Sequence, residues 1–134
     1  GAPCMQGTIG VLAEISVTNL PPGKHGMHVH SMGMCDHDEG FKTASGHVND
    51  TDKAHGYLNA EGPEQGDLPN IIVHADGTAN LELFLPQLDV NGESGALMDV
   101  DGSALMIHAN PDDHTTQPIG GSGPRIACGI IQSK

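Results

Sequence analysis

The stretch KHGMHVH, residues 24–30, alternates apolar and polar side chains over its last four positions. A period of two is typical of a β-strand, because successive side chains of a strand point to opposite faces. We therefore expect Met27 and Val29 to face the core, and His28 and His30 to point outward together. Side chains two apart on a strand lie roughly 6 to 7 Å apart, so this strand presents a pair of neighbouring imidazoles.

Similar patterns recur along the chain and predict further strands. VLAEISVTNL (11–20) is expected to be a half-buried strand, and NIIVHADGTANLELFLPQ (70–87) a hairpin with an ADG turn. ALMDVDGSALMIHAN (96–110) is expected to be a second hairpin, with Met106 and His108 pointing outward from its second arm. RIACGII (125–131) closes the chain as a last strand.

Length and composition indicate one all-β domain. The 134 residues fit a single domain, residues 1–134, and 19 Gly with 9 Pro favour short strands over helices. Residues 31–70 and the segment NPDDHTTQPIGGSGP (110–124) carry little apolar periodicity, which predicts two long loops. We expect antiparallel strands in a Greek-key, immunoglobulin-like sandwich or flattened barrel.

The charge balance bears on partners. Seventeen acidic against five basic residues give a formal net charge of −12, which makes nucleic acid or an anionic membrane an unexpected partner. No apolar run approaches the ~20 residues of a membrane span.

A histidine pair on one strand is by itself a weak indication, because exposed histidines are more often solvated than metal-bound. The long loop adds His47 and His55, followed by Glu64 and Asp67. Imidazole suits copper and zinc, and imidazole mixed with carboxylate suits zinc. This composition predicts a loop that folds around metal.

Six motifs occur in an order that identifies a family. HGMHVH, SGHVND, AHGYLN, GDLPN, MIHANPDD and GPRIACGII follow one another, with eight residues from His47 to His55 and four from His108 to Asp112. Over roughly residues 11–132 the chain resembles the copper,zinc superoxide dismutases. It is most similar to their bacterial branch, because of GDLPN and the short ending QPIGGSGPRIACG.

The resemblance implies a set of site residues. His55 and Asp67 fall on zinc-ligand positions, and Asp112 on the carboxylate that joins the two metal sites through hydrogen bonds to ligand imidazoles. Arg125 falls on the arginine that attracts and docks superoxide. Four histidines fall on copper-ligand positions, the third of which also bridges to zinc: His28, His30, His47 and His108.

The activity implied is dismutation of superoxide to O2 and H2O2, with His47 giving a proton to the product. The alternative is a non-catalytic copper-binding or buffering module of the same fold. A negative body repels superoxide, so an enzyme would need a locally positive funnel, for which Arg125, Lys42 and Lys53 are the candidates.

Three cysteines without a CxxC pair allow one disulfide and a spare thiol, or no disulfide. The resemblance implies that Cys35 pairs with Cys128 and ties the metal-binding loop to the last strand. A disulfide implies an oxidising compartment, periplasmic or extracellular. Cys4 is left over and is expected to be buried as a small apolar side chain.

One departure from the family lies in the zinc site. Nine residues after His55, where the family has a third zinc histidine, this chain has Glu64. A carboxylate can bind zinc, but the alternatives are a distorted site or one completed by water. Nearby substitutes are Asp52, Glu61 and His74.

A second departure is at the N-terminus, where GAPCMQGTIG leaves room for one strand before residue 11 and the family has two. A missing strand would open a sheet edge that needs cover, and the choice between monomer and homodimer stays open. The remaining histidines are interpreted as structural (His25) or as surface and loop residues (His37, His114). GGSG at 120–123 is interpreted as a turn.

Overall fold

The computed structural model describes residues 2–92 and 94–133, and these residues form strands with a single short helical turn, as predicted. The elements are β1 (Ala2–Gln6), β2 (Val11–Val17), β3 (Gly23–His25), β4 (Met27–His30), the 3-10 turn η1 (Lys42–Ala44), β5 (Ile71–Val73), β6 (Ala79–Leu85), β7 (Ala104–His108) and β8 (Arg125–Ser133). Among the described residues, no helix is long and apolar enough to cross a membrane.

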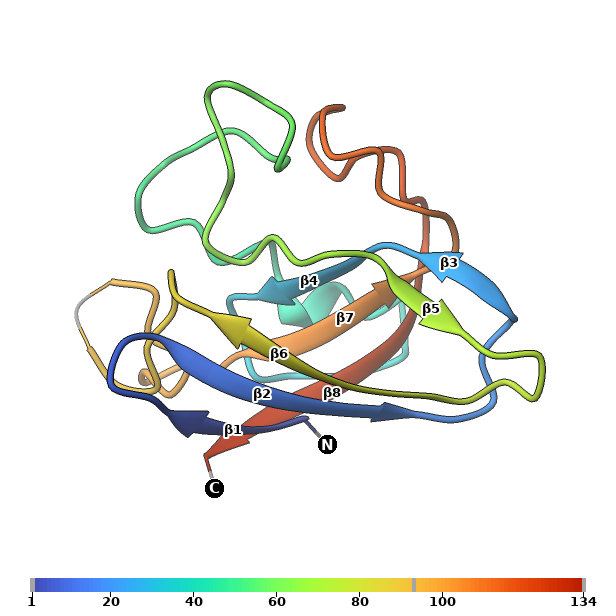
Figure 1. The fold of residues 1–134 in the computed structure, drawn as a ribbon, viewed down its shortest axis with the longest axis horizontal. Helices are drawn as coiled ribbons and strands as arrows, with labels where there is room; N and C mark the ends of the chain where they lie inside the picture. Colours follow the sequence, from blue (N-terminus) through green and yellow to red (C-terminus); the bar gives the residue numbers. More distant parts are fainter. Residues whose placement is uncertain (1, 93, 134) are drawn as a thin grey trace.

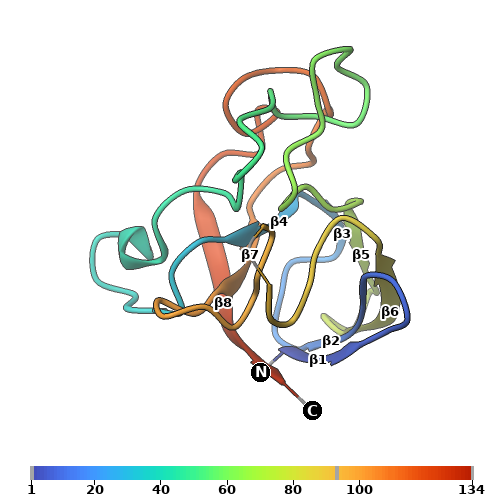
Figure 2. The same ribbon diagram turned by 90° about the vertical axis from the view of Figure 1, so that its left-hand side faces the viewer.

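The strands form a curled sheet with a smaller partner sheet. The larger sheet has the order β4-β7-β8-β1-β2-β6, and β3 pairs with β5 beside it. Figures 1 and 2 show the large sheet curling around a core, with the loop after β4 and the loop after β7 rising on the same side. These two predicted loops therefore lie over neighbouring strands, where they can build a site together.

The pairing of β2 with β6 illustrates how the apolar alternation builds the core. The strands run antiparallel in register from Val11↔Leu85 to Val17↔Ala79. Val11, Leu85 and Ala79 are buried in the aliphatic core and Leu81 and Leu83 pack against it, while the alternate side chains of β6 are exposed: Asn80, Glu82 and Phe84. Burial of one face fixes the register, because a shift by one residue would expose the whole apolar set.

Both predicted hairpins are wrong in their pairing. The turn after β5 is present, with the His74 amide donating to the Thr78 carbonyl at 2.8 Å, but β5 pairs with β3 and β6 with β2. The first arm of the second hairpin is not a strand. Its Leu97 amide donates to the Asp89 carbonyl at 2.8 Å, so the segment folds back on the residues after β6 and leaves β7 to pair with β4 and β8.

The outward-pointing side chains of β4 and β7 are also not on the surface. His28, His30, Met106 and His108 are all buried. The long loop covers this face and continues the sheet beyond β4, since the Val29 amide donates to the Gly66 carbonyl at 2.8 Å. The period of two gave the direction of these side chains correctly, but the pattern carries no information about a loop that covers them.

The chain ends are tied into the same sheet. One strand, β1, precedes β2, as expected from the short N-terminal segment. It pairs antiparallel with β2 (Cys4↔Ala13) but parallel with β8 (Ala2↔Ile131), so the expectation of antiparallel strands is wrong at this position. Cys4 is buried as predicted, and burial raises the pKa of its thiol.

The disulfide between Cys35 and Cys128 is present, with the two Cα atoms 5.6 Å apart and a sequence separation of 93 residues. It joins the start of the long loop to β8, as the family resemblance implied. This crosslink fixes the loop beside the face of β4 and β7 on which the histidines gather.

Candidate metal centre

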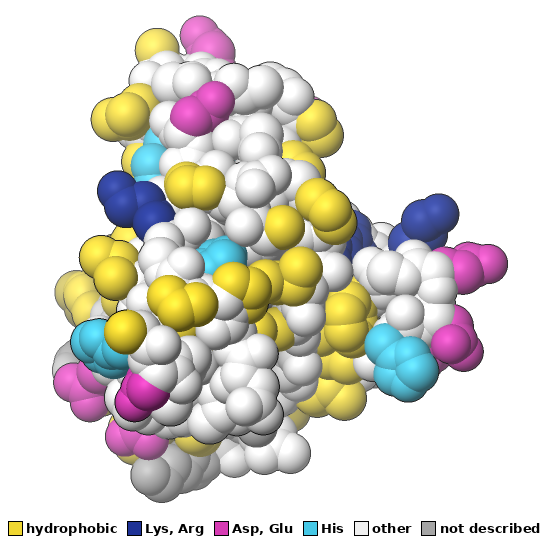
Figure 3. Space-filling model, turned by 90° about the vertical axis from the view of Figure 1, so that its right-hand side faces the viewer, with side chains coloured by type: hydrophobic (Ala, Val, Ile, Leu, Met, Phe, Trp, Pro, Cys, Tyr) yellow, Lys and Arg dark blue, Asp and Glu magenta, His cyan; other side chains and the backbone are white. Residues whose placement is uncertain are grey.

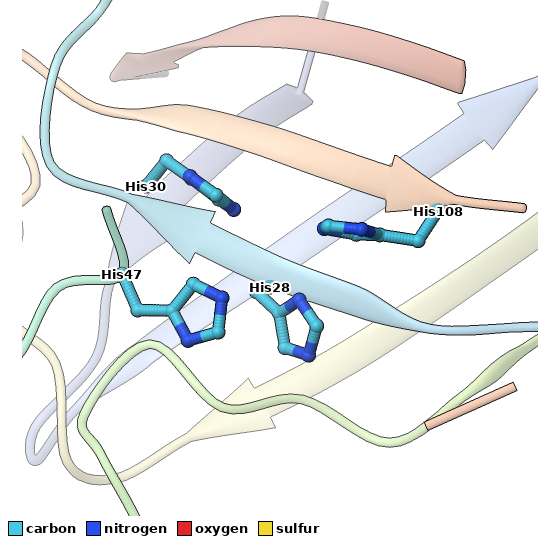
Figure 4. A group of neighbouring side chains, drawn as sticks. All are labelled: His28, His30, His47 and His108. Atoms are coloured by element: carbon cyan, nitrogen blue, oxygen red, sulfur yellow. The ribbon is translucent and has the colours of Figure 1, made fainter. Parts of the chain in front are cut away.

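Four histidines gather between β4, β7 and the long loop. His28 and His30 come from β4 and His108 from the end of β7. His47 comes from the loop, where it forms a bridge with His30. Figure 4 shows the four rings around one common space, and one ligand atom from each lies within 4.8 Å of the others.

In each of the four rings, one nitrogen is fixed by a hydrogen bond. His28 Nε2 bonds to Asp112 Oδ2 at 2.7 Å, His30 Nδ1 to the Ser45 carbonyl at 2.7 Å, and His108 Nδ1 to the Gly123 carbonyl at 2.8 Å. A carbonyl or carboxylate oxygen accepts, so the bonded nitrogen carries the proton. Each of these three bonds therefore fixes a tautomer and the direction of a ring.

The remaining nitrogens have no partner. They are buried and unbonded in the described structure, and they are His28 Nδ1, His30 Nε2, His47 Nε2 and His108 Nε2. A buried polar atom without a partner is costly, so four of them aimed into one space call for a ligand. Neutral imidazole nitrogens are the donors that copper and zinc accept. The residues present therefore fit a copper ion.

Burial also keeps three of these rings neutral. Desolvation lowers the pKa of His28, lowers that of His30 to about 2, and lowers that of His108 to about 4. A ring that stays unprotonated at neutral pH offers its free lone pair to a metal without first losing a proton.

A second group adjoins the first and shares His47 with it. Glu64 Oε1 lies 2.7 Å from His47 Nδ1 and 3.2 Å from His55 Nδ1, and Asp67 Oδ1 lies 2.6 Å from His55 Nδ1. Ligand atoms of these four residues also lie within 4.8 Å of one another. Two imidazoles and two carboxylates form a donor set that zinc accepts.

The carboxylate of Asp67 is held by the backbone. Its Oδ2 accepts from the amides of Gly56 at 2.8 Å and Glu64 at 2.9 Å. Its Oδ1 is thereby aimed at the histidines. The loop residues 56–67 thus wrap around the Asp67 side chain, which explains why a segment without apolar periodicity is ordered here.

The second group is charged where the first is neutral. Burial alone lowers the pKa of His55, but hydrogen bonds to Asp112, Asp67 and Glu64 outweigh burial and raise it to about 11. Burial raises the pKa of Glu64, but hydrogen bonds from His47 and His55 outweigh it and lower this pKa to about 2. The group therefore satisfies its own polar atoms through ion pairs.

Asp112 joins the two groups, at the place that the resemblance implied. Its Oδ2 lies 2.7 Å from His28 Nε2 and 2.9 Å from His55 Nε2, and its Oδ1 accepts from the His114 amide at 2.7 Å. Burial raises the pKa of Asp112, but the hydrogen bonds from His28 and His55 outweigh it and hold this pKa far below its ordinary value.

Arg125 lies beside the copper-binding group. A β-bulge between Ile107 and His108 sets His108 opposite Arg125, and bulges often re-aim side chains beside functional sites. The guanidinium donates to the carbonyls of Phe41 at 2.8 Å and Ser45 at 2.7 Å. It lines one pocket with Lys42 and His108, and a second with His47 and Glu64.

The predicted positive funnel is therefore present only in part. Lys42 and Arg125 line an opening over His108, together with Glu39. Lys53 lines neither opening. Its backbone amide donates to the Asn49 side chain. Figure 3 shows few Lys and Arg side chains on the face that it presents, in keeping with the acidic composition.

The other candidates lie outside both groups. Asp52, Glu61 and His74 are exposed and belong to none of the groups found among the described residues. His25 bonds through its two ring nitrogens to the carbonyls of His108 at 2.9 Å and Pro21 at 2.7 Å, which is the structural role predicted for it.

Sequence reasoning missed the residues that act through backbone or small size. The Ser45 and Gly123 carbonyls orient two ligand histidines, and side-chain identity gives no signal for a carbonyl acceptor. Gly120 was interpreted as part of a turn, but a Cβ there would meet both Asp112 and His55. Its position in a GG pair within the second loop was the one available signal.

Comparisons with known proteins agree with this geometry. A family model described as copper/zinc superoxide dismutase (SODC) matches residues 4–131. A "Superoxide dismutase [Cu-Zn]" of Caulobacter vibrioides is 47% identical over 126 residues, which is 92% of this chain and 72% of that protein. "Superoxide dismutase [Cu-Zn] 1" of Aquifex aeolicus is 40% identical over 133 residues, 98% of this chain and 78% of that protein.

Solved structures give the same result for the fold. A SOD-like protein from Bacillus subtilis superposes with a TM-score of 0.88 at 38% identity, covering 94% of this chain and 84% of that one. The Cu/Zn superoxide dismutase from Brucella abortus superposes with a TM-score of 0.71 at 28% identity, covering 96% and 85%.

Fold and site together define a metalloprotein built on a curled β-sheet, with two groups of potential metal ligands that share one imidazole. The chain belongs to the copper/zinc superoxide dismutase family. The family that the six sequence motifs indicated is thus confirmed.

Proposed function

We propose that this protein is an enzyme that dismutates superoxide, converting two superoxide anions and two protons to O2 and H2O2. The observation that carries the proposal is the set of four unpartnered buried nitrogens described above. Copper bound there would supply one-electron chemistry, accepting an electron from one superoxide and giving it to another. His28, His30, His47 and His108 would hold it.

His47 is the residue that we assign to proton transfer. Its Nε2 faces the copper-binding group and its Nδ1 the second group, so it is the imidazole common to both. A positioned imidazole can hold a proton on Nε2 and give it to the reduced product, which is general acid catalysis.

Arg125 is assigned to docking the substrate anion. Its guanidinium is held by two carbonyls at the opening over the histidines, so its positive charge is fixed at that opening. A fixed cation where an anion binds lowers the energy of the bound state without reorganisation. Lys42 at the same opening adds to the attraction.

We assign zinc to the second group, with His47, His55, Glu64 and Asp67 as its ligands. Asp112 bonds to a ring of each group, so it orients ligands of both metals. The disulfide favours an oxidising compartment, and we place the protein in the periplasm or outside the cell. The acidic charge speaks against nucleic acid or membrane as partners.

The test is the rate of superoxide decay, measured by pulse radiolysis with copper-loaded protein and normalised to bound copper. A chelator removes free copper ions, and zinc is first omitted and then added. We expect a rate near the diffusional ceiling of about 10⁸ to 10⁹ M⁻¹s⁻¹. Substitution of the exposed His37 by Ala is the control and leaves the rate unchanged. Protein that retains copper but turns over slowly would be a copper-buffering module instead.

A further inference from the structure

Glu64 differs from the other members of the second group in its surroundings. The side chains of His47, His55 and Asp67 are at most 3% exposed, whereas that of Glu64 is 13% exposed. Glu64 also lines the pocket that contains Arg125 and Pro118. Glu64 and His47 therefore face the same opening as the substrate-binding arginine, and Glu64 is the more exposed of the two.

One oxygen of Glu64 occupies the centre of the group. Oε1 lies within 3.2 Å of both His47 Nδ1 and His55 Nδ1, so it faces the same two nitrogens that would bind a metal. The rigid Asp67 carboxylate sits on the other side, at 2.6 Å from His55 Nδ1. The donor set thus consists of two imidazole nitrogens and two carboxylate oxygens.

Such a donor set discriminates differently among divalent ions from one with three imidazoles. Imidazole suits zinc and copper, whereas carboxylate oxygen suits harder ions such as Mn²⁺. Exchange of one imidazole for a carboxylate removes a ligand that favours zinc. It also adds a negative charge that attracts every divalent ion alike.

We propose that Glu64 sets the metal selectivity of the second site, so that it accepts the harder ion Mn²⁺ with a reduced preference for Zn²⁺. This inference rests on the proposed assignment of Glu64 as a ligand. Zn²⁺ still binds more tightly than Mn²⁺, as the general order of affinities requires. The ratio of Zn²⁺ affinity to Mn²⁺ affinity is smaller with Glu64 than it would be with histidine at this position.

The experiment measures metal affinities directly. Metal-free protein first receives one equivalent of Cu⁺ without oxygen, which fills the four-histidine group with a colourless, diamagnetic ion. Co²⁺ binding is then followed by its visible absorption and Mn²⁺ binding by electron paramagnetic resonance, each in competition with Zn²⁺. The proteins compared are wild type, Glu64→His, Glu64→Gln and, as a matched control in the same loop, the exposed Glu61→Gln.

We expect the ratio of Zn²⁺ to Mn²⁺ affinity to rise at least about tenfold in Glu64→His, equivalent to about 1.4 kcal/mol. Glu64→Gln should weaken binding of all three ions and change the Co²⁺ spectrum, and Glu61→Gln should match wild type. Equal ratios in wild type and Glu64→His, or an unchanged Co²⁺ spectrum in Glu64→Gln, would overturn the inference. Neither readout involves superoxide, so a failure of the dismutase proposal would leave this result standing.

Discussion

The two metal-binding groups share His47, yet they differ in whether their polar side-chain atoms have hydrogen-bond partners within the protein. The copper-binding group leaves four buried nitrogens without a partner, and burial keeps His28, His30 and His108 neutral. The second group pairs its atoms with one another, and its carboxylates hold His55 protonated. The first is preorganised for a ligand, whereas the second is already satisfied and must exchange protons for metal.

The largest expected difference between the groups is in activity. We expect His108→Ala to lose copper-dependent dismutation entirely, because it removes one of four copper ligands. His55→Ala should keep the rate per bound copper within about tenfold, the scale of an outer-shell effect. Stopped-flow superoxide decay, with bound copper measured in each sample, checks both. Equal losses in the two variants would mean that the groups act as one unit.

The next effect concerns the disulfide, which anchors the part of the loop that serves the copper side. Replacement of Cys35 and Cys128 by Ser should lower the free energy of unfolding by about 4 to 5 kcal/mol on the chain-entropy account, measured by denaturant titration. Copper affinity should fall more than zinc affinity, because the loop near Cys35 supplies the Ser45 carbonyl to His30. Cys4→Ser is the control. A larger fall in zinc affinity than in copper affinity would contradict the expectation that the disulfide serves the copper side.

Asp112 is the place where the two groups can be uncoupled. In the native protein one charged oxygen of Asp112 accepts hydrogen bonds from both His28 and His55. The uncharged amide of Asp112→Asn cannot replace that oxygen, so both rings lose their fixed orientation. We expect zinc affinity to fall by about 10- to 100-fold, measured by competition with a coloured chelator. The exposed neighbour Asp113→Asn should leave it unchanged. An unchanged affinity in Asp112→Asn would show that the Asp67 carboxylate alone suffices.

The smallest effect is on the pH dependence of metal-free stability, where the groups act with opposite sign. The pKa values of His28, His30 and His108 are lowered on folding, so their contribution is present above about pH 6.5 and is lost as the pH falls. The pKa of His55 is raised, so its contribution is present below about pH 6.5 and is lost as the pH rises toward 11.

Metal-free protein should therefore be most stable near pH 6 to 7, and each proton of difference contributes a slope of up to about 1.4 kcal/mol per pH unit. Thermal or denaturant unfolding across pH 5 to 9 measures both limbs. Zinc should abolish the alkaline limb, because it displaces the proton from His55. A flat profile from pH 7 to 9 without metal would mean that His55 is neutral in the folded protein.

The parts of the molecule that follow from local chemistry could be predicted. Alternation placed the strands and the direction of His28 and His30, and ordered motifs named the residues that the fold brings together in the two groups. Pairing could not be predicted, because partners such as β3 for β5 are chosen by the closure of the whole sheet. Burial of the histidines escaped prediction for a related reason: the cover comes from a loop that contacts β4 only after folding.

The positions that tune the site were the hardest to predict. The Ser45 and Gly123 carbonyls act through the backbone, which every residue carries. Gly120 acts by what it lacks, since any side chain would collide with Asp112. The amino-acid sequence alone indicates neither kind of contribution, although it did show Glu64 as a departure from the family motif.

The parallel contact of β1 with β8 joins the first strand to the last, with Ala2 opposite Ile131. A ribosome delivers β1 well before this partner, so β1 has just one of its two neighbours until β8 has been synthesised. Contacts so distant along the chain form slowly, because they close a large loop. The nascent protein therefore carries an unfinished sheet edge until β8 is made, and Cys128, the second cysteine of the disulfide, arrives with that same strand.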